Sequence, residues 1–80
     1  MLTGEQIRAA RALARMEQTA LASASGISVE TVKRLERAVG SISANTSTEA
    51  AIRRAFSDAG VIFLDENGEG PGVRLRKSAG

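Results

Sequence analysis

The segment from Gln18 to Arg37 constrains the fold more than any other part of the chain, because it has the pattern of two short helices joined by a glycine turn. Ala22 lies inside the first helix, where a small residue lets two helices cross closely. Gly26 falls at the turn, since glycine has no Cβ and tolerates a positive φ. Ser28 is a suitable N-cap for the second helix, because its hydroxyl can accept a hydrogen bond from a main-chain N–H.

The second helix of this unit, expected over residues 29–37, has two different faces. Val32 and Leu35 are three residues apart and are expected to point into the core. The opposite face carries Val29, Glu30, Lys33, Arg34 and Arg37. A helix with a polar and basic outer face after a short glycine turn is typical of a helix that lies in the DNA major groove. Periodicity alone would fit an ordinary helical hairpin with a solvated face equally well.

Length and composition limit what else the chain can be. Eighty residues form one small domain, which buries only about 60% of the surface of its unfolded chain. There is no cysteine or histidine, so we expect no disulfide, no metal site and no cofactor. No set of residues suggests an activated nucleophile or an acid–base pair, so we expect no enzymatic activity. The net charge of +2 is too small to indicate a nucleic-acid partner by itself.

The chain is expected to be a soluble, cytoplasmic protein. No apolar run reaches the ~18–20 residues that a membrane-spanning helix needs. The first residues, Met1 to Glu5, lack the basic and then apolar pattern of a signal peptide.

Two further helices are predicted on either side of the central unit. Thr3 and Gln6 have the spacing of a capping box, which starts a helix whose core face includes Arg11. A second capping box at Thr46–Glu49 predicts a helix through Ala59, with Gly60 at the C′ position that terminates it. The loop before it, residues 38–45, is expected to pack Ile42 into the core.

The last part of the chain has the pattern of a β-hairpin. Val61–Leu64 is a continuous apolar run, residues 65–72 are rich in turn formers, and residues 73–77 alternate between apolar and basic. An isolated two-stranded hairpin is at best marginally stable, and the apolar run needs cover on both faces. We therefore expect the same hairpin of a second chain to cover it. The residues expected at this interface are Val61, Ile62, Phe63, Leu64, Val73 and Leu75.

Two patterns in the hairpin turn imitate ligand sites. Asp65, Asn67 and Glu69 resemble the start of a calcium loop, but Arg76 stands where that loop needs a bidentate Glu. The glycines of residues 68–72 imitate a phosphate-binding loop, but they precede a strand instead of a helix. Turn chemistry explains both patterns better.

Taken together, these residues resemble the phage-repressor/Cro-like (XRE-type) helix-turn-helix regulators of bacteria, and in particular the short ones that end in a β-hairpin. The resemblance extends over nearly the whole chain. The residues that carry it are Arg11, Gln18, Leu21-Ala22, Gly26-Ile27-Ser28, Val32, Leu35-Glu36, Ala55 to Gly60 and Gly70-Pro71-Gly72-Val73-Arg74. It implies a mainly α Cro/C1-like fold of four to five helices with a C-terminal hairpin. Residues 1–60 would form the DNA-binding domain and residues 61–80 the dimerisation extension.

The resemblance also implies roles for individual residues. Gln18, at the start of the second helix, would donate to a DNA phosphate, and Arg37 would lie against the phosphate backbone. Arg11 and Glu36 would form a partly buried ion pair, as an Arg on a core face requires. The expected DNA-binding set is Gln18, Ser28, Val29, Glu30, Thr31, Lys33, Arg34 and Arg37.

The chemistry of the outer face suggests how bases would be read. The guanidinium of Arg34 can bond to O6 and N7 of guanine together, Glu30 can accept from N4 of cytosine, and Val29 can touch a thymine methyl group. Glu30 and Arg34 could instead form an i,i+4 ion pair on a solvated face.

We therefore expect a sequence-specific transcriptional regulator that binds a pseudo-palindromic site on double-stranded DNA as a homodimer. Two other functions fit the same residues. The chain could be a DNA-binding antitoxin whose hairpin binds a toxin, or a protein-interaction module that binds polymerase or another regulator.

Overall fold

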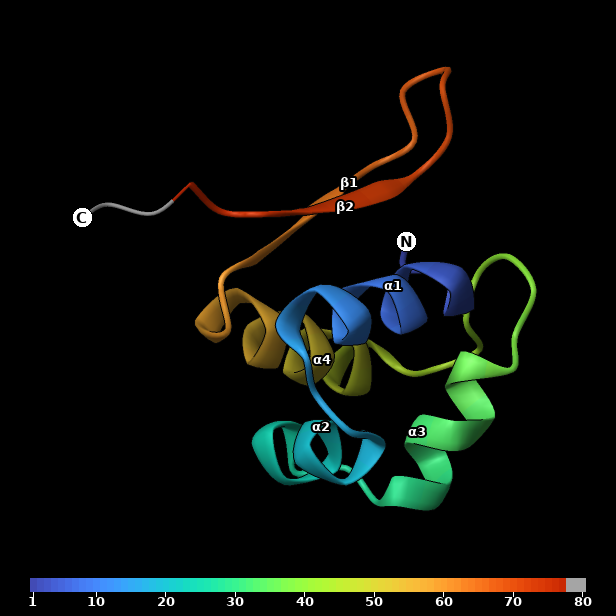
Figure 1. Ribbon diagram of the computed structural model, residues 1–80. Coiled ribbons are helices and arrows are strands. Elements are labelled where there is room, and N and C mark those ends of the chain that lie inside the picture. Colours follow the sequence, from blue (N-terminus) through green and yellow to red (C-terminus); the bar gives the residue numbers. More distant parts are fainter. Residues whose placement is uncertain (78–80) are drawn as a thin grey trace.

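The computed structural model describes residues 1–77, which form four helices followed by a two-stranded hairpin (Figure 1). The elements are α1 (Gly4–Ala14), α2 (Gln18–Ser25), α3 (Val29–Glu36), α4 (Thr46–Asp58), β1 (Val61–Leu64) and β2 (Gly72–Leu75). The predicted fold class, mainly α with a C-terminal hairpin, is confirmed. The sequence also suggests a frayed end at residues 78–80, but these lie outside the described residues.

The capping box predicted at the start of α1 is present. The main-chain N–H of Gln6 donates to Oγ1 of Thr3 (3.0 Å), and the main-chain N–H of Thr3 donates to Oε1 of Gln6 (2.9 Å). Two N–H groups at the helix start are satisfied in this way. The helix ends at Arg15, whose φ of 56° is left-handed.

The turn between α2 and α3 also has the predicted geometry. Gly26 has a φ of 75°, and its N–H donates to the carbonyl of Ala22 (2.9 Å). Ser28 is the N-cap of α3, because its Oγ accepts from the N–H of Thr31 (3.1 Å). In contrast, Glu17, the N-cap of α2, makes no side-chain cap bond.

One predicted helix start is wrong. The N-cap of α4 is Asn45, whose Oδ1 accepts from the N–H of Thr48 (2.8 Å), so Thr46 is already helical and does not begin a capping box. Asn caps helices at least as well as Thr, and it stands one residue earlier. Gly60 takes the predicted C′ position with a φ of 88°, while the helix itself ends at Asp58 and Ala59 is its C-cap.

The helices enclose one apolar core. Val32 and Leu35 are buried as predicted, and Ile42 joins them from the loop between α3 and α4. The largest fully buried side chains are Phe56, Leu2, Ile7, Leu21, Leu35, Ile52 and Val32. None of the helices within residues 1–77 is long and apolar enough to cross a membrane.

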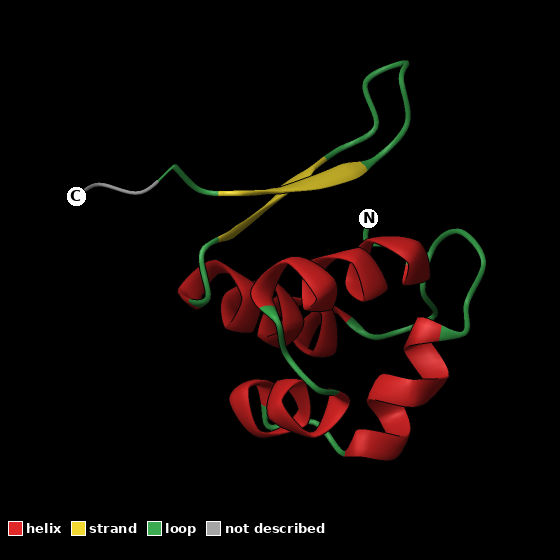
Figure 2. Ribbon diagram, viewed as in Figure 1, coloured by secondary structure: helices red, strands yellow, loops and turns green. Residues whose placement is uncertain are grey.

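The hairpin packs on the side of α1 and α4 that faces away from α2 and α3 (Figures 1 and 2). Its strands are antiparallel, with Val61 opposite Leu75. The second strand begins and ends earlier than the predicted residues 73–77. Val61 is buried in the core, and the ring of Phe63 meets that of Phe56 edge-on, with 5.7 Å between centroids. The root of the hairpin is therefore part of the main core.

Candidate nucleic-acid interface

The outward face of α3 is open to solvent, on the opposite side of the molecule from the hairpin (Figure 1). Lys33, Arg34 and Arg37 are all exposed, whereas Val32 and Leu35 on the other face are each only 1% exposed. The same eight-residue helix therefore holds an apolar stripe in the core and presents a basic face outward.

Arg34 extends along the surface instead of pairing with Glu30. Its Nη1 donates to the carbonyl of Ser43 (3.3 Å), in the loop before α4. The salt bridges within residues 1–77 join Arg11 to Glu36 and Arg53 to Glu49, so the alternative i,i+4 pair between Glu30 and Arg34 is not formed there. The carboxylate of Glu30 therefore does not bond to Arg34. The bond to Ser43 uses one of the five guanidinium N–H donors of Arg34 and leaves four.

Ser28 and Thr31 lie at the start of α3 and bond to each other. Oγ of Ser28 donates to Oγ1 of Thr31 (2.9 Å) while it accepts from the Thr31 main-chain N–H. Both residues thus shape the turn through which the chain enters the helix.

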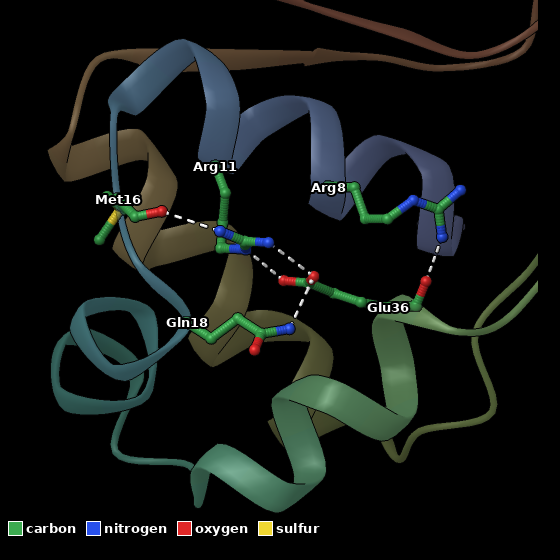
Figure 3. Close-up of polar contacts among 5 residues, drawn as sticks. All are labelled: Arg8, Arg11, Met16, Gln18 and Glu36. Atoms are coloured by element: carbon green, nitrogen blue, oxygen red, sulfur yellow. Dashed lines mark hydrogen bonds and ion pairs between the residues drawn. The ribbon is translucent and has the colours of Figure 1, made fainter.

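Glu36 closes the other end of α3 and connects three elements (Figure 3). The residue is 4% exposed, and its carboxylate accepts from Nε of Arg11 (2.5 Å) and Nη2 of Arg11 (2.9 Å). This two-bond geometry is the strongest form of a carboxylate–guanidinium pair. Hydrogen bonding to the carboxylate raises the pKa of Arg11 above its usual value. Arg11 also donates to the carbonyl of Met16 (2.9 Å), which holds the chain between α1 and α2.

Gln18 makes the third hydrogen bond to this carboxylate. Its Nε2 donates to Oε1 of Glu36 (3.1 Å), so the amide that the resemblance assigns to a phosphate is held in place without DNA (Figure 3). An amide nitrogen carries two N–H donors. One of them bonds to Glu36, and this bond leaves the other N–H unused.

Two residues of α1 that the sequence did not single out also contact the end of α3. Nη1 of Arg8 donates to the main-chain carbonyl of Glu36. A Cβ on Gly4 would lie 2.2 Å from the carbonyl oxygen of Ala38 and 2.9 Å from that of Leu35. Only glycine allows α1 to approach this closely. In the sequence, the only sign of this close approach was that Gly4 stands in the first turn of a predicted helix.

Gln6 has a second role that the sequence also missed. It is 4% exposed, and its Nε2 donates to the carbonyls of Leu64 (3.2 Å) and Gly72 (3.0 Å), one on each strand. The capping-box pattern accounts for its oxygen but gives no sign of where its nitrogen goes.

The residues predicted at a dimer interface differ in how far the fold buries them. Val61 is buried, while Ile62, Phe63 and Val73 are half-buried. Leu64 and Leu75 are the exposed members, at 37% and 52%.

The hairpin turn has the geometry of a turn and not that of an ion site. The carboxylate of Glu66 accepts from the main-chain N–H groups of Gly68 (2.7 Å) and Gly70 (3.0 Å). Across residues 1–77, no group of three or more acidic side chains is placed to hold a metal ion.

The comparison with known families agrees with this geometry. The model of the helix-turn-helix family matches residues 7–51, which is more than half of the chain and includes α2, the glycine turn and α3. A search among curated proteins gave no match. The chain therefore belongs to the helix-turn-helix family of the XRE/Cro-C1 type, whose members bind DNA and are not enzymes.

Proposed function

We propose that this protein is a transcriptional regulator that binds a pseudo-palindromic DNA site as a homodimer and reads base edges with α3. The observation that carries the proposal is the basic outward face of α3. Lys33, Arg34 and Arg37 are all exposed, with Arg34 lying along the surface toward Ser43, while Glu36 ties the end of the helix to α1. A helix held in this way can enter the major groove without rearranging the core.

Some side chains of this surface would contact bases, and others would contact phosphates. Arg34 is the main base-reading residue, because a guanidinium can bond to both acceptors of a guanine. Val29 and Glu30 would contact neighbouring bases, and Lys33 is within the same face. Arg37, at the end of the helix, and Gln18, at the start of α2, would contact phosphates, which fix the register without reading sequence.

The exposed apolar residues of the hairpin support the homodimer. Leu64 and Leu75 leave apolar surface open on a sheet of only two strands. Covering it with the same hairpin of a second chain would bury that surface and add to a small core. In such a dimer the two α3 helices would read half-sites about 34 Å apart.

The experiment that tests this function begins with selection of a preferred site from random duplexes. Arg34→Ala should then weaken binding to that site by about 1–3 kcal/mol and relax one base position, because a base contact is lost. Arg37→Ala is the matched variant, and it should weaken binding to the preferred and scrambled sites alike. Equal losses on both duplexes for Arg34→Ala would contradict base reading by this residue.

A further inference from the structure

We propose that Gln6 is a positioning residue that sets the angle of the hairpin relative to α3, and thereby the spacing between half-sites that the dimer accepts. This inference rests on the proposed function. The hairpin is attached to the helices at two places, at its root and near its turn. The root is fixed in the core by Val61, and Arg76 donates its N–H to the carbonyl of Gly60 (2.6 Å).

The turn end of the hairpin is attached differently. Gln6 donates to one carbonyl on each strand, at the pair Leu64 and Gly72, which is the last pair before the turn. Within residues 1–77, these two are the side-chain hydrogen bonds from α1 to the hairpin. Beside them lies an open cleft of about 490 Å³, with Pro71 and Val73 in its lining. Phe63 and Val73, the pair before Leu64 and Gly72, pack against the core, so the Gln6 amide acts on the hairpin beyond that pair, where the cleft leaves it less covered.

The same helix holds the end of α3. Arg8 and Arg11 donate to the main chain and the carboxylate of Glu36, and Gly4 permits close contact with the carbonyls of Leu35 and Ala38. Gln6 and Arg11 are five residues apart, about 7.5 Å along a rigid helix. A short, hydrogen-bonded path thus connects the proposed dimer element with the proposed reading helix.

The spacing of half-sites is sensitive to this path. One added base pair moves a half-site by about 3.4 Å and turns it by about 35° around the duplex. A dimer whose hairpins are held at one angle can satisfy only one spacing. A dimer whose hairpins pivot about their roots can adapt to several.

The test compares binding of the full chain to two half-sites with the preferred spacer and with one base pair added or removed. The wild-type protein should lose about tenfold in affinity for the altered spacers. Gln6→Met keeps the length and apolar contacts of the side chain but removes both donors. Its preference should fall below about threefold, while its affinity for a single half-site should stay within about twofold of the wild type.

Two further variants separate positioning from stability. Thr3→Ala removes a cap bond from α1 but leaves the Gln6 amide on the hairpin, so it should lower Tm and keep the spacer preference. Gln6→Glu keeps the capping-box oxygen but cannot donate at neutral pH, and it should behave like Gln6→Met.

Each other outcome overturns the inference. Folded Gln6 variants that keep the spacer preference would refute the positioning role and leave the proposed function intact. A wild-type protein with no preferred sequence or spacing would overturn both. Loss of folding in both Gln6 variants, seen by circular dichroism, would make Gln6 a purely structural residue.

Discussion

Gly4 is the residue at which α1 comes closest to the end of α3. Its N–H donates to the carbonyl of Gly40 (3.1 Å), and two more carbonyl oxygens occupy the space that a Cβ would need. In an ordinary helix, replacing glycine with alanine stabilises by roughly 0.5–1 kcal/mol. Gly4→Ala should instead lower the free energy of unfolding by about 1–3 kcal/mol, because main-chain atoms must move apart.

Urea unfolding measures this change, and Gly72→Ala is the matched control. A Cβ at Gly72 would meet the side chain of Leu64 at an ordinary contact distance of 3.6 Å, so this variant should be close to the wild type. Stabilisation by Gly4→Ala would contradict the close approach.

The buried carboxylate of Glu36 supports the second residue-scale prediction. Glu36→Gln removes the charge that faces Arg11 and should lower the free energy of unfolding by about 3 kcal/mol, because a buried ion pair has lost one partner. Glu49→Gln is the control, since the pair of Glu49 with Arg53 is partly exposed and should contribute less than about 1 kcal/mol. If the two variants lowered the free energy of unfolding in urea equally, the buried pair of Glu36 with Arg11 would stabilise the fold no more than the exposed pair.

Glu5 gives a prediction about pH. Hydrogen bonds from its own main-chain N–H and from that of Gly40 lower the pKa of its carboxyl below the usual value. A carboxyl whose pKa is lower in the folded state stabilises that state above its usual pKa, and the effect is lost as the pH falls through the folded value. The Tm difference between wild type and Glu5→Gln should therefore be present at pH 7 and shrink as the pH falls below the usual pKa of a glutamate carboxyl. A difference that grows on acidification would have the wrong sign.

The residues that the sequence missed share one property. Gly4, Gln6 and Arg8 contact main-chain carbonyls that lie between 28 and 66 residues away along the chain. A carbonyl leaves no mark in the sequence, so no pattern of residue types could identify these contacts. The pairing of Arg11 with Glu36 was expected only because the chain resembles a known family.

Among the helices and strands, local signals were sufficient for the turn between α2 and α3 but not for every boundary. Gly26 and Ser28 identified the turn and the start of α3 because their requirements, a positive φ and a cap oxygen, act within four residues. The start of α4 was placed one residue late, since Asn45 and Thr46 can both cap and the choice depends on how the preceding loop approaches. The length of β2 depends on how far it pairs with β1. The alternation within residues 73–77 does not determine this pairing.

The exposed apolar residue Leu75 of the hairpin gives a prediction about the proposed dimer. Leu75→Glu should convert the proposed dimer to a monomer, because a charge in the centre of an apolar interface loses its water. Val39→Glu is the matched control, as Val39 is an apolar residue that is 90% exposed outside the hairpin. Light scattering coupled to gel filtration gives the mass of each variant. A Leu75→Glu protein with the mass of the wild type would place the interface elsewhere.

In the whole molecule, the two proposed functional surfaces, the outward face of α3 and the hairpin, lie on opposite sides of the helices α1 and α4. The hairpin packs on α1 and α4, and α2 and α3 lie beyond them (Figure 2). This arrangement leaves the basic face of α3 uncovered by the hairpin of its own chain. It also means that α1, which contacts both the hairpin and α3, can connect a change in the hairpin to α3.

An NMR titration shows whether the outward face of α3 is the surface that contacts DNA. Uniformly ¹⁵N-labelled protein would be titrated with its preferred duplex and the amide shifts followed residue by residue. The largest changes should fall on residues 28–37 and on Gln18, with small changes in β1 and β2. Large changes confined to the hairpin, with the amides of α3 unmoved, would contradict the claim.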